Sequence, residues 1–155
     1  MQTHRGTCAD TSQGQPLPPK ARRHKKANEP RFDARTPLYR LAGVALTTIE
    51  GMAEGTALVL LSEIGTARRR WPRVKPLCSW LGLSPPHKIA GGKGRSPRVR
   101  PGAQRVAVAL RLAARTDHKA RTALGAFFRR LRSRLGAPKA ITATAHTRAR
   151  LGYTL

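Results

Sequence analysis

Apolar residues recur at helical spacing along most of the chain after residue 31. Ala57, Leu60, Leu61 and Ile64 occupy positions i, i+3, i+4 and i+7, and Gly65 follows as a helix stop. The strongest stripe comes later and consists of Leu124, Phe127, Phe128, Leu131 and Leu135, stopped by Gly136 and Pro138. Further helices are predicted over about 74–81 and 105–115. An apolar pattern also begins at Leu38, Leu41 and Val44 and continues through Leu46, Ile49 and Met52. The chain therefore reads as an all-α domain.

The last predicted helix, over about 139–153, is only weakly amphipathic. Arg148 and Gly152 stand where apolar side chains would be expected. Trp71, Cys78 and Trp80 fall on apolar positions around the helix predicted at 74–81, and we expect all three in the core.

A tight turn separates two of the predicted helices. The segment LTTIEGMAEGTALVLLSEIG, residues 46–65, reads as a helix, a turn at Glu50-Gly51 and a second helix. This order resembles a helix-hairpin-helix, a module that offers turn amides and a helix N-terminus to DNA phosphates. Ala53 stands where that motif usually has its second glycine, and an ordinary two-helix packing unit is the alternative.

Residues 1–31 contain almost no aliphatic side chains, so they cannot offset the entropy cost of ordering. We expect a disordered basic arm over 1–31 and a folded domain over 32–155. The cluster Lys20 to Lys26 in the arm suits phosphate contacts, although such charge runs are also common in plain solvated tails.

The charge balance points to a polyanionic partner. Thirty-one Lys and Arg face seven Asp and Glu, which gives a net charge of +24. No apolar run approaches the roughly 20 residues that span a bilayer, and the first thirty residues hold no secretory apolar segment. We expect a cytoplasmic protein that joins the nucleoid when bound to DNA, with no membrane partner.

Neither cysteines nor histidines indicate a metal site. Cys8 lies in the polar arm and Cys78 in a predicted helix, so a disulfide framework is not expected. The five histidines are scattered without ligand spacing. We expect no metal and no cofactor held by this chain.

The stretch from Trp80 to Gly102 carries the candidate chemistry, because it combines closely spaced glycines with many cations. Glycines let backbone amides approach an anion, and the cations neutralise it. A solvated basic loop is the alternative. The expected nucleic-acid-binding residues are Lys88, Gly91, Gly92, Lys93, Arg95, Arg98, Arg100 and, at the start of the next helix, Arg105.

Several pieces together resemble the C-terminal domain of the insertion-sequence transposases of the one-ten/one-sixteen/nine-zero-two group. They are FDARTPLYRLAGVALTTIEGM, TALVLLSEIG, SWLGLSP, GGK, ALRLAA, ALGAFFRRLRSRLGAPKAITATAH and a closing Tyr, within residues 32–153. The resemblance implies an enzyme of mobile elements that cuts and rejoins DNA through a serine nucleophile. It also implies a RuvC-like domain whose acids bind Mg²⁺, and a structured guide RNA.

The chain departs from that pattern at two points. Ala90 occupies the position of the family's nucleophilic serine, and a methyl group cannot attack phosphorus. The seven acids are scattered, and no stretch reads as the acidic RuvC-like domain. Ser84 and Ser96 flank the loop outside the family position.

These observations predict a truncated or degenerate transposase C-terminal domain that binds DNA and is inactive alone, with no catalytic residue of its own. The further partners implied are a guide RNA and a full-length transposase or a second copy of the chain. The alternatives are a basic structural RNA- or DNA-binding protein without catalysis, and a product that does not fold.

Overall fold

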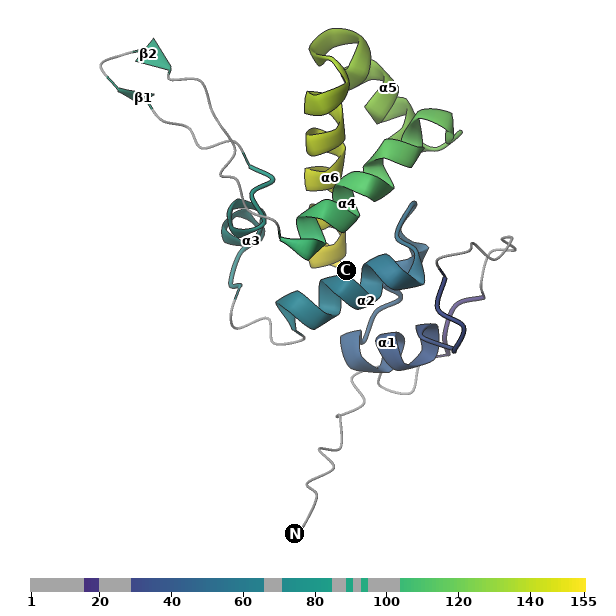
Figure 1. Cartoon of the computed structure of the whole chain (residues 1–155). Coiled ribbons are helices and arrows are strands. Elements are labelled where there is room, and N and C mark those ends of the chain that lie inside the picture. Colours follow the sequence, from purple (N-terminus) through teal and green to yellow (C-terminus); the bar gives the residue numbers. More distant parts are fainter. Residues whose placement is uncertain (1–15, 20–28, 66–70, 85–88, 91–92, 95–103) are drawn as a thin grey trace.

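The computed structural model describes residues 16–19, 29–65, 71–84, 89–90, 93–94 and 104–155 (Figure 1). In these segments almost all regular structure is helical, which confirms the all-α prediction. The elements are α1 (Arg35–Ala42), the 3₁₀ helix η1 (Leu46–Thr48), α2 (Glu54–Ile64), α3 (Val74–Trp80), β1 (Ile89–Ala90), β2 (Lys93–Gly94), α4 (Arg105–Arg115), the 3₁₀ helix η3 (Thr116–Lys119), α5 (Ala123–Leu135) and α6 (Ala137–Thr154).

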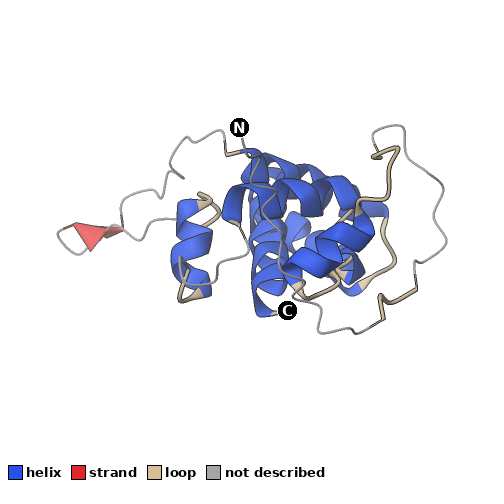
Figure 2. Cartoon of the chain, turned by 90° about the horizontal axis from the view of Figure 1, so that it is seen from below, coloured by secondary structure: helices blue, strands red, loops and turns tan. Residues whose placement is uncertain are grey.

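Helix α6 is the hub of the packing. It lies against α3, α4 and α5, while α2 packs on α4 and α1 packs on α2. Alanines at the α4–α6 contact, among them Ala107, Ala114, Ala145 and Ala149, are almost fully buried. Because small side chains let two helices approach closely, this contact is tight enough to organise the rest of the domain. The two short strands project away from the helices, as Figures 1 and 2 show.

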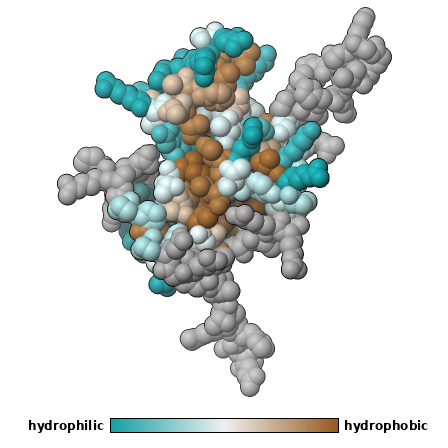
Figure 3. Space-filling view, turned by 180° about the vertical axis from the view of Figure 1, so that it is seen from behind, coloured by the Kyte–Doolittle hydropathy of each residue, from teal (hydrophilic) through white to brown (hydrophobic). Residues whose placement is uncertain are grey.

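Apolar side chains from five helices share one core. Leu38, Leu60, Leu77 and Leu110 are all buried in it, together with Cys78. The expectation that Cys78 is a core residue is therefore confirmed. On the face shown in Figure 3, apolar residues occupy the middle and hydrophilic side chains gather at the upper end.

Local sequence explains how α5 begins and ends. The Thr122 hydroxyl accepts a hydrogen bond from the Gly125 amide at 3.2 Å and caps the N-terminus. Gly136, with φ +82°, ends α5 as predicted. Pro138 plays a different part from the one expected, because it lies in the first turn of α6, where a missing amide hydrogen costs nothing.

The helix expected immediately before the Glu50-Gly51 turn is only the three-residue η1. Gly43, with φ +72°, ends α1 and interrupts the apolar pattern before η1 begins. The turn itself is present: the Met52 amide donates to the Ile49 carbonyl at 3.0 Å, and Gly51 has φ +73°. A 3₁₀ helix, a turn and α2 therefore replace the expected helix, turn and helix.

Part of the expected basic arm touches the helical domain. The Arg35 guanidinium donates hydrogen bonds to the Pro18 carbonyl and to the Thr47 hydroxyl, so residues near Pro18 lie against α1 and η1. Residues 1–15 and 20–28, which hold the cluster Lys20 to Lys26, lie outside the described residues. Over the described segments, no helix combines the length and apolar character that a membrane span requires.

Candidate nucleic-acid interface

The glycine-rich stretch lies on a short antiparallel hairpin. Ile89 pairs with Gly94 and Ala90 pairs with Lys93, and only two residues separate the strands in the sequence. Ala90, where the resemblance implies a nucleophilic serine, thus lies directly opposite Lys93 in the ladder. The remaining residues expected in this interface, Lys88, Gly91, Gly92, Arg95, Arg98 and Arg100, lie outside the described residues.

The chain enters and leaves this region through anchored segments. After α3, Leu81 and Leu83 are buried, and the Leu83 amide donates to the Cys78 carbonyl at 3.0 Å. Val106 is equally buried where the chain returns at the start of α4. The Arg111 guanidinium donates to the Gly82 carbonyl at 3.1 Å and ties α4 to the end of α3. The described segments before and after the loop are therefore packed into the helical domain.

Arg105, also expected in the interface, stands at the first position of α4. Its side chain is 84% exposed, and its Nε lies 3.9 Å from Glu63 Oε1. An exposed ion pair at this distance contributes little, so Glu63 does not hold the guanidinium in place. The Arg105 guanidinium therefore remains exposed and able to change its orientation.

The two tryptophans pack against each other at the edge of the core. Their ring centroids are 5.0 Å apart with the planes tilted by 45°, and both rings are half-buried against the core. The Tyr153 hydroxyl donates to the Trp71 carbonyl at 2.8 Å. Trp71 and Trp80 thus pack against the core without being fully buried in it, and Tyr153 has a structural role next to Trp71.

A buried ion pair that the sequence reasoning missed lies on the other side of α6. Arg148 is fully buried, and its Nη2 donates to both carboxylate oxygens of Asp117 at 2.9 and 2.8 Å. Its Nε donates to the Glu50 carbonyl at 2.8 Å. Arg148 thus joins η3 and α6 to the turn that precedes α2.

The same guanidinium explains the glycine in that turn. A Cβ built on Gly51 would lie 2.3 Å from Arg148 Nη2, and the residue also has φ +73°. A sequence signal for the pair existed, because Asp117 is the single acid after Glu63 and Arg148 interrupts an apolar stripe. An isolated acid and a cation at an otherwise apolar position have opposite charges, and this could have suggested that Asp117 and Arg148 pair.

Neither the Asp117 carboxyl nor the Cys78 thiol is activated as a catalytic group. Burial raises the pKa of the Asp117 carboxyl, while the neighbouring Arg148 opposes that shift. Burial also raises the pKa of the Cys78 thiol, which makes it a poor nucleophile. Across the described segments, no three His, Cys, Asp or Glu side chains come together as a possible metal site.

Comparison with known proteins was informative at the level of the family. Residues 43–129, more than half of the chain, match the family described as "Transposase IS116/IS110/IS902 family". No curated protein and no solved structure matches the chain. The matched range covers α2, α3, the hairpin, α4 and most of α5. The chain therefore belongs to the IS116/IS110/IS902 transposase family.

Proposed function

We propose that the chain binds double-stranded DNA in the transposition reaction of its family, and that it does not cut or rejoin strands by itself. The observation that carries the proposal is the family match, which extends on both sides of the glycine-rich hairpin. The net charge of +24 supports a polyanionic partner. The loop cations Lys88, Lys93, Arg95, Arg98 and Arg100, with Gly91 and Gly92 and with Arg105 at the hairpin base, would contact the phosphates.

The proposed lack of cleavage rests on Ala90. The family resemblance implies a serine hydroxyl at this position, and alanine has no atom that could form the bond to phosphorus. The resemblance also implies Mg²⁺ held by an acidic domain. The described carboxylates do not fit such a site, because no three of them come together with one another or with a His or Cys, and Asp117 is paired with Arg148.

Binding is tested with a labelled DNA duplex over a range of salt concentrations. If about six phosphates are contacted, log Kobs should fall with log salt with a slope of about −5. Replacing Lys93, Arg95 and Arg98 with alanine should make that slope less steep by about two to three units. A flat salt response of the unmodified chain would remove nucleic acid as the partner.

The matched control replaces Arg31, Arg40 and Lys75, which are exposed cations on or before α1 and α3. Both triple variants lower the net charge by the same amount. An equal loss of slope in the two variants would show that binding follows overall charge and that the loop is not a specific contact.

Strand cleavage is tested by denaturing gels that detect a protein-linked DNA strand. Neither the unmodified chain nor Ala90→Ser should form the adduct alone. Ala90→Ser should form it only with Mg²⁺, guide RNA and the acidic domain of a full-length relative, because hydroxyl and metal are both required. An adduct with the unmodified chain would make Ser84 or Ser96 the candidate nucleophile. If Ala90→Ser forms no adduct even with Mg²⁺, guide RNA and the acidic domain, a non-catalytic binding protein would be favoured.

A further inference from the structure

The described C-terminal part of the chain, residues 104–155, exposes cations but no carboxylate side chain. Its single acid, Asp117, is 3% exposed and paired with the buried Arg148. Ordinary solvated helices mix both signs, because opposite charges three or four residues apart stabilise each other. The exposed cations of this part are Arg105, Arg115, Lys119, Arg121, Arg129, Arg130, Arg132, Arg134, Lys139 and Arg150.

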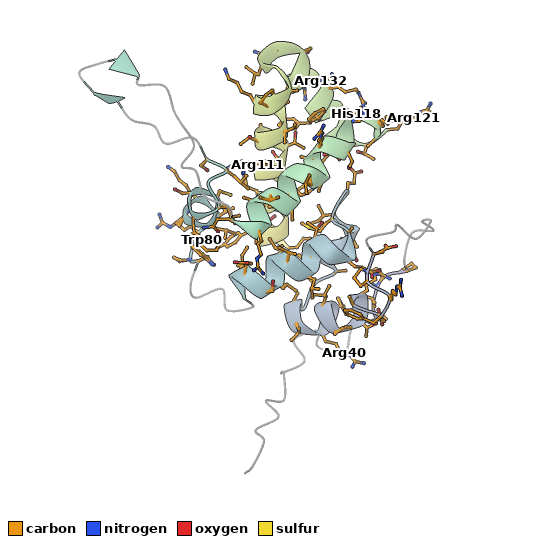
Figure 4. All side chains as sticks on the ribbon, in the orientation of Figure 1. Arg40, Trp80, Arg111, His118, Arg121 and Arg132 are labelled. Carbon is orange, nitrogen blue, oxygen red and sulfur yellow. The ribbon has the colours of Figure 1, made fainter. Side chains whose placement is uncertain are left out.

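Seven of these cations belong to or flank α5, and one of them, Arg129, donates to the Ala120 carbonyl. We call the other six the α5 basic surface: Lys119, Arg121, Arg130, Arg132, Arg134 and Lys139. In Figure 4, Arg121 and Arg132 mark the two ends of α5, and Arg121 lies on the side of α4 away from Trp80. The β1–β2 hairpin projects from the side of α3 (Figure 1). The α5 basic surface is therefore separate from the hairpin.

Tight packing holds the η3 end of this surface against α5. The Arg129 guanidinium donates to the Ala120 carbonyl at 2.7 Å. A Cβ built on Gly125 would lie only 2.2 Å from the same carbonyl oxygen, so the two backbones are in close contact. Lys119 and Arg121, on either side of Ala120, are thus fixed beside the first turn of α5.

Helix stability alone does not account for these charges. Arg132 and Arg134 lie in the last turn of α5, where a cation interacts favourably with the helix dipole. Arg130 and Arg134, however, are four residues apart and repel each other on an exposed face. At the adjoining start of α6, no side chain caps the helix, so its free amides add positive potential.

We propose that the α5 basic surface is a second contact for the phosphate backbone of double-stranded DNA, independent of the hairpin. The proposal rests on the DNA binding proposed above. A set of exposed cations without a neighbouring exposed acid on α5 fits a uniform polyanion better than a protein partner, which would carry both signs. Single strands are disfavoured because no Phe, Tyr or Trp side chain in residues 104–155 is exposed for stacking on bases: Phe127 and Tyr153 are only partly exposed and Phe128 is buried.

The test compares three variants of the full chain on one labelled duplex. The first replaces Arg130, Arg132 and Arg134 with glutamine, the second replaces Arg31, Arg40 and Lys75, and the third replaces Lys93, Arg95 and Arg98. The first should make the salt slope less steep by about two to three units, since each lost phosphate contact removes about 0.9. The second should change it by less than about one unit. Thermal unfolding of each variant confirms that it remains folded.

The α5 and hairpin variants should also be additive, because the two surfaces are separate. An α5 variant that behaves like the Arg31, Arg40 and Lys75 control would overturn the α5 contact while leaving the proposed function intact. If the α5 variant had a less steep salt slope only on an RNA duplex of the same length, the proposal would also be overturned, because the partner of this surface would not be DNA. Failure of the unmodified chain to bind any duplex would overturn the proposed function itself.

Lysine acetylation read by mass spectrometry locates the contact directly. Lys119 and Lys139 flank α5 and are exposed, so bound duplex should protect both from modification. Replacing Arg130, Arg132 and Arg134 should remove that protection. Protection restricted to Lys88 and Lys93 would place all of the DNA on the hairpin and overturn the second contact.

Discussion

Burial of Arg148 and Asp117 removes two charges from water, and this desolvation is costly even for a well-formed pair. The guanidinium is not fully compensated either: its Nη1 is buried and finds no hydrogen-bond partner among the described residues. The Thr144 hydroxyl, one turn earlier on α6, is also buried and also finds no hydrogen-bond partner among the described residues. Two hydrogen bonds from Arg148 to Asp117 and one to the Glu50 carbonyl offset the desolvation of the pair.

Removing one partner of this pair should be far worse than removing both. Arg148→Met leaves the Asp117 carboxyl buried without its cation, and we expect a loss of about 3–5 kcal/mol in the free energy of unfolding. Arg148→Met combined with Asp117→Leu should recover much of that loss, because no charge remains buried. Urea denaturation measures both values. Wild-type stability of the single variant would show that the pair does not hold the turn.

His146 on α6 should make stability depend on pH. Burial, followed by the nearby Arg150, lowers the pKa of its imidazole below the ordinary 6.5. Stability from the neutral ring is therefore fully present above pH 6.5 and is lost as pH falls through the lowered pKa of the folded state. His146→Gln should weaken this loss in denaturant midpoints recorded over that window. The control is His118→Gln at an exposed position; equal profiles for all three proteins would contradict the prediction.

At the scale of elements, two helical glycines offer a matched comparison. A Cβ on Gly125 would collide with the Ala120 backbone, whereas a Cβ on Gly55 in α2 would meet nothing within 4 Å. Gly125→Ala should destabilise the domain by about 1–3 kcal/mol through overpacking, and Gly55→Ala should stabilise it by up to about 1 kcal/mol. Thermal unfolding should show shifts of opposite sign. Two shifts of the same sign would mean that the η3–α5 contact is not tight.

The helices were predictable because their apolar spacing and glycine stops are local signals. The α5 stripe and the stop at Gly136 needed no tertiary information. The break between α1 and η1 was missed because Gly43 lies inside an apolar pattern that continues smoothly on both sides. Gly152 was interpreted as a position where an apolar side chain was lacking. In the structure it lies against Leu60 and Met52, whose side chains would be 3.6 and 3.7 Å from a Cβ built on Gly152. Close packing of that kind depends on the partner elements and leaves no periodic trace.

Less of the interface could be predicted than of the fold. The sequence singled out the cations around the hairpin, and the pairing of Ala90 with Lys93 gives two of those positions a structural setting. The charges of α5 were visible too, but the sequence did not show that Asp117, the one acid in residues 104–155, is buried and paired with Arg148. The role of Arg148 could not be read from spacing, because its partners lie 31 and 98 positions away in the sequence.

For the whole molecule, limited proteolysis tests the division into a basic arm and a folded domain. We expect trypsin to cut first within Lys20 to Lys26 and to leave a resistant core that begins between Arg31 and Leu38, since the arm lacks aliphatic residues. Mass spectrometry of the fragments identifies the boundary. Protection of that cluster in the free protein would contradict the disordered arm, and digestion without a core would support a chain that does not fold.

The hydrogen bond from Arg148 to Glu50 also constrains the order in which the chain can fold. Closing contacts between residues 98 positions apart is slow, because a large loop must be ordered before the contact forms. During synthesis, α1 and α2 emerge well before α6 and cannot complete their packing until it arrives. Because α6 covers α4 in the folded domain, we expect the apolar side of α4 to lack its final cover until the last helix has been made, and the nascent protein to be most prone to aggregation in that interval.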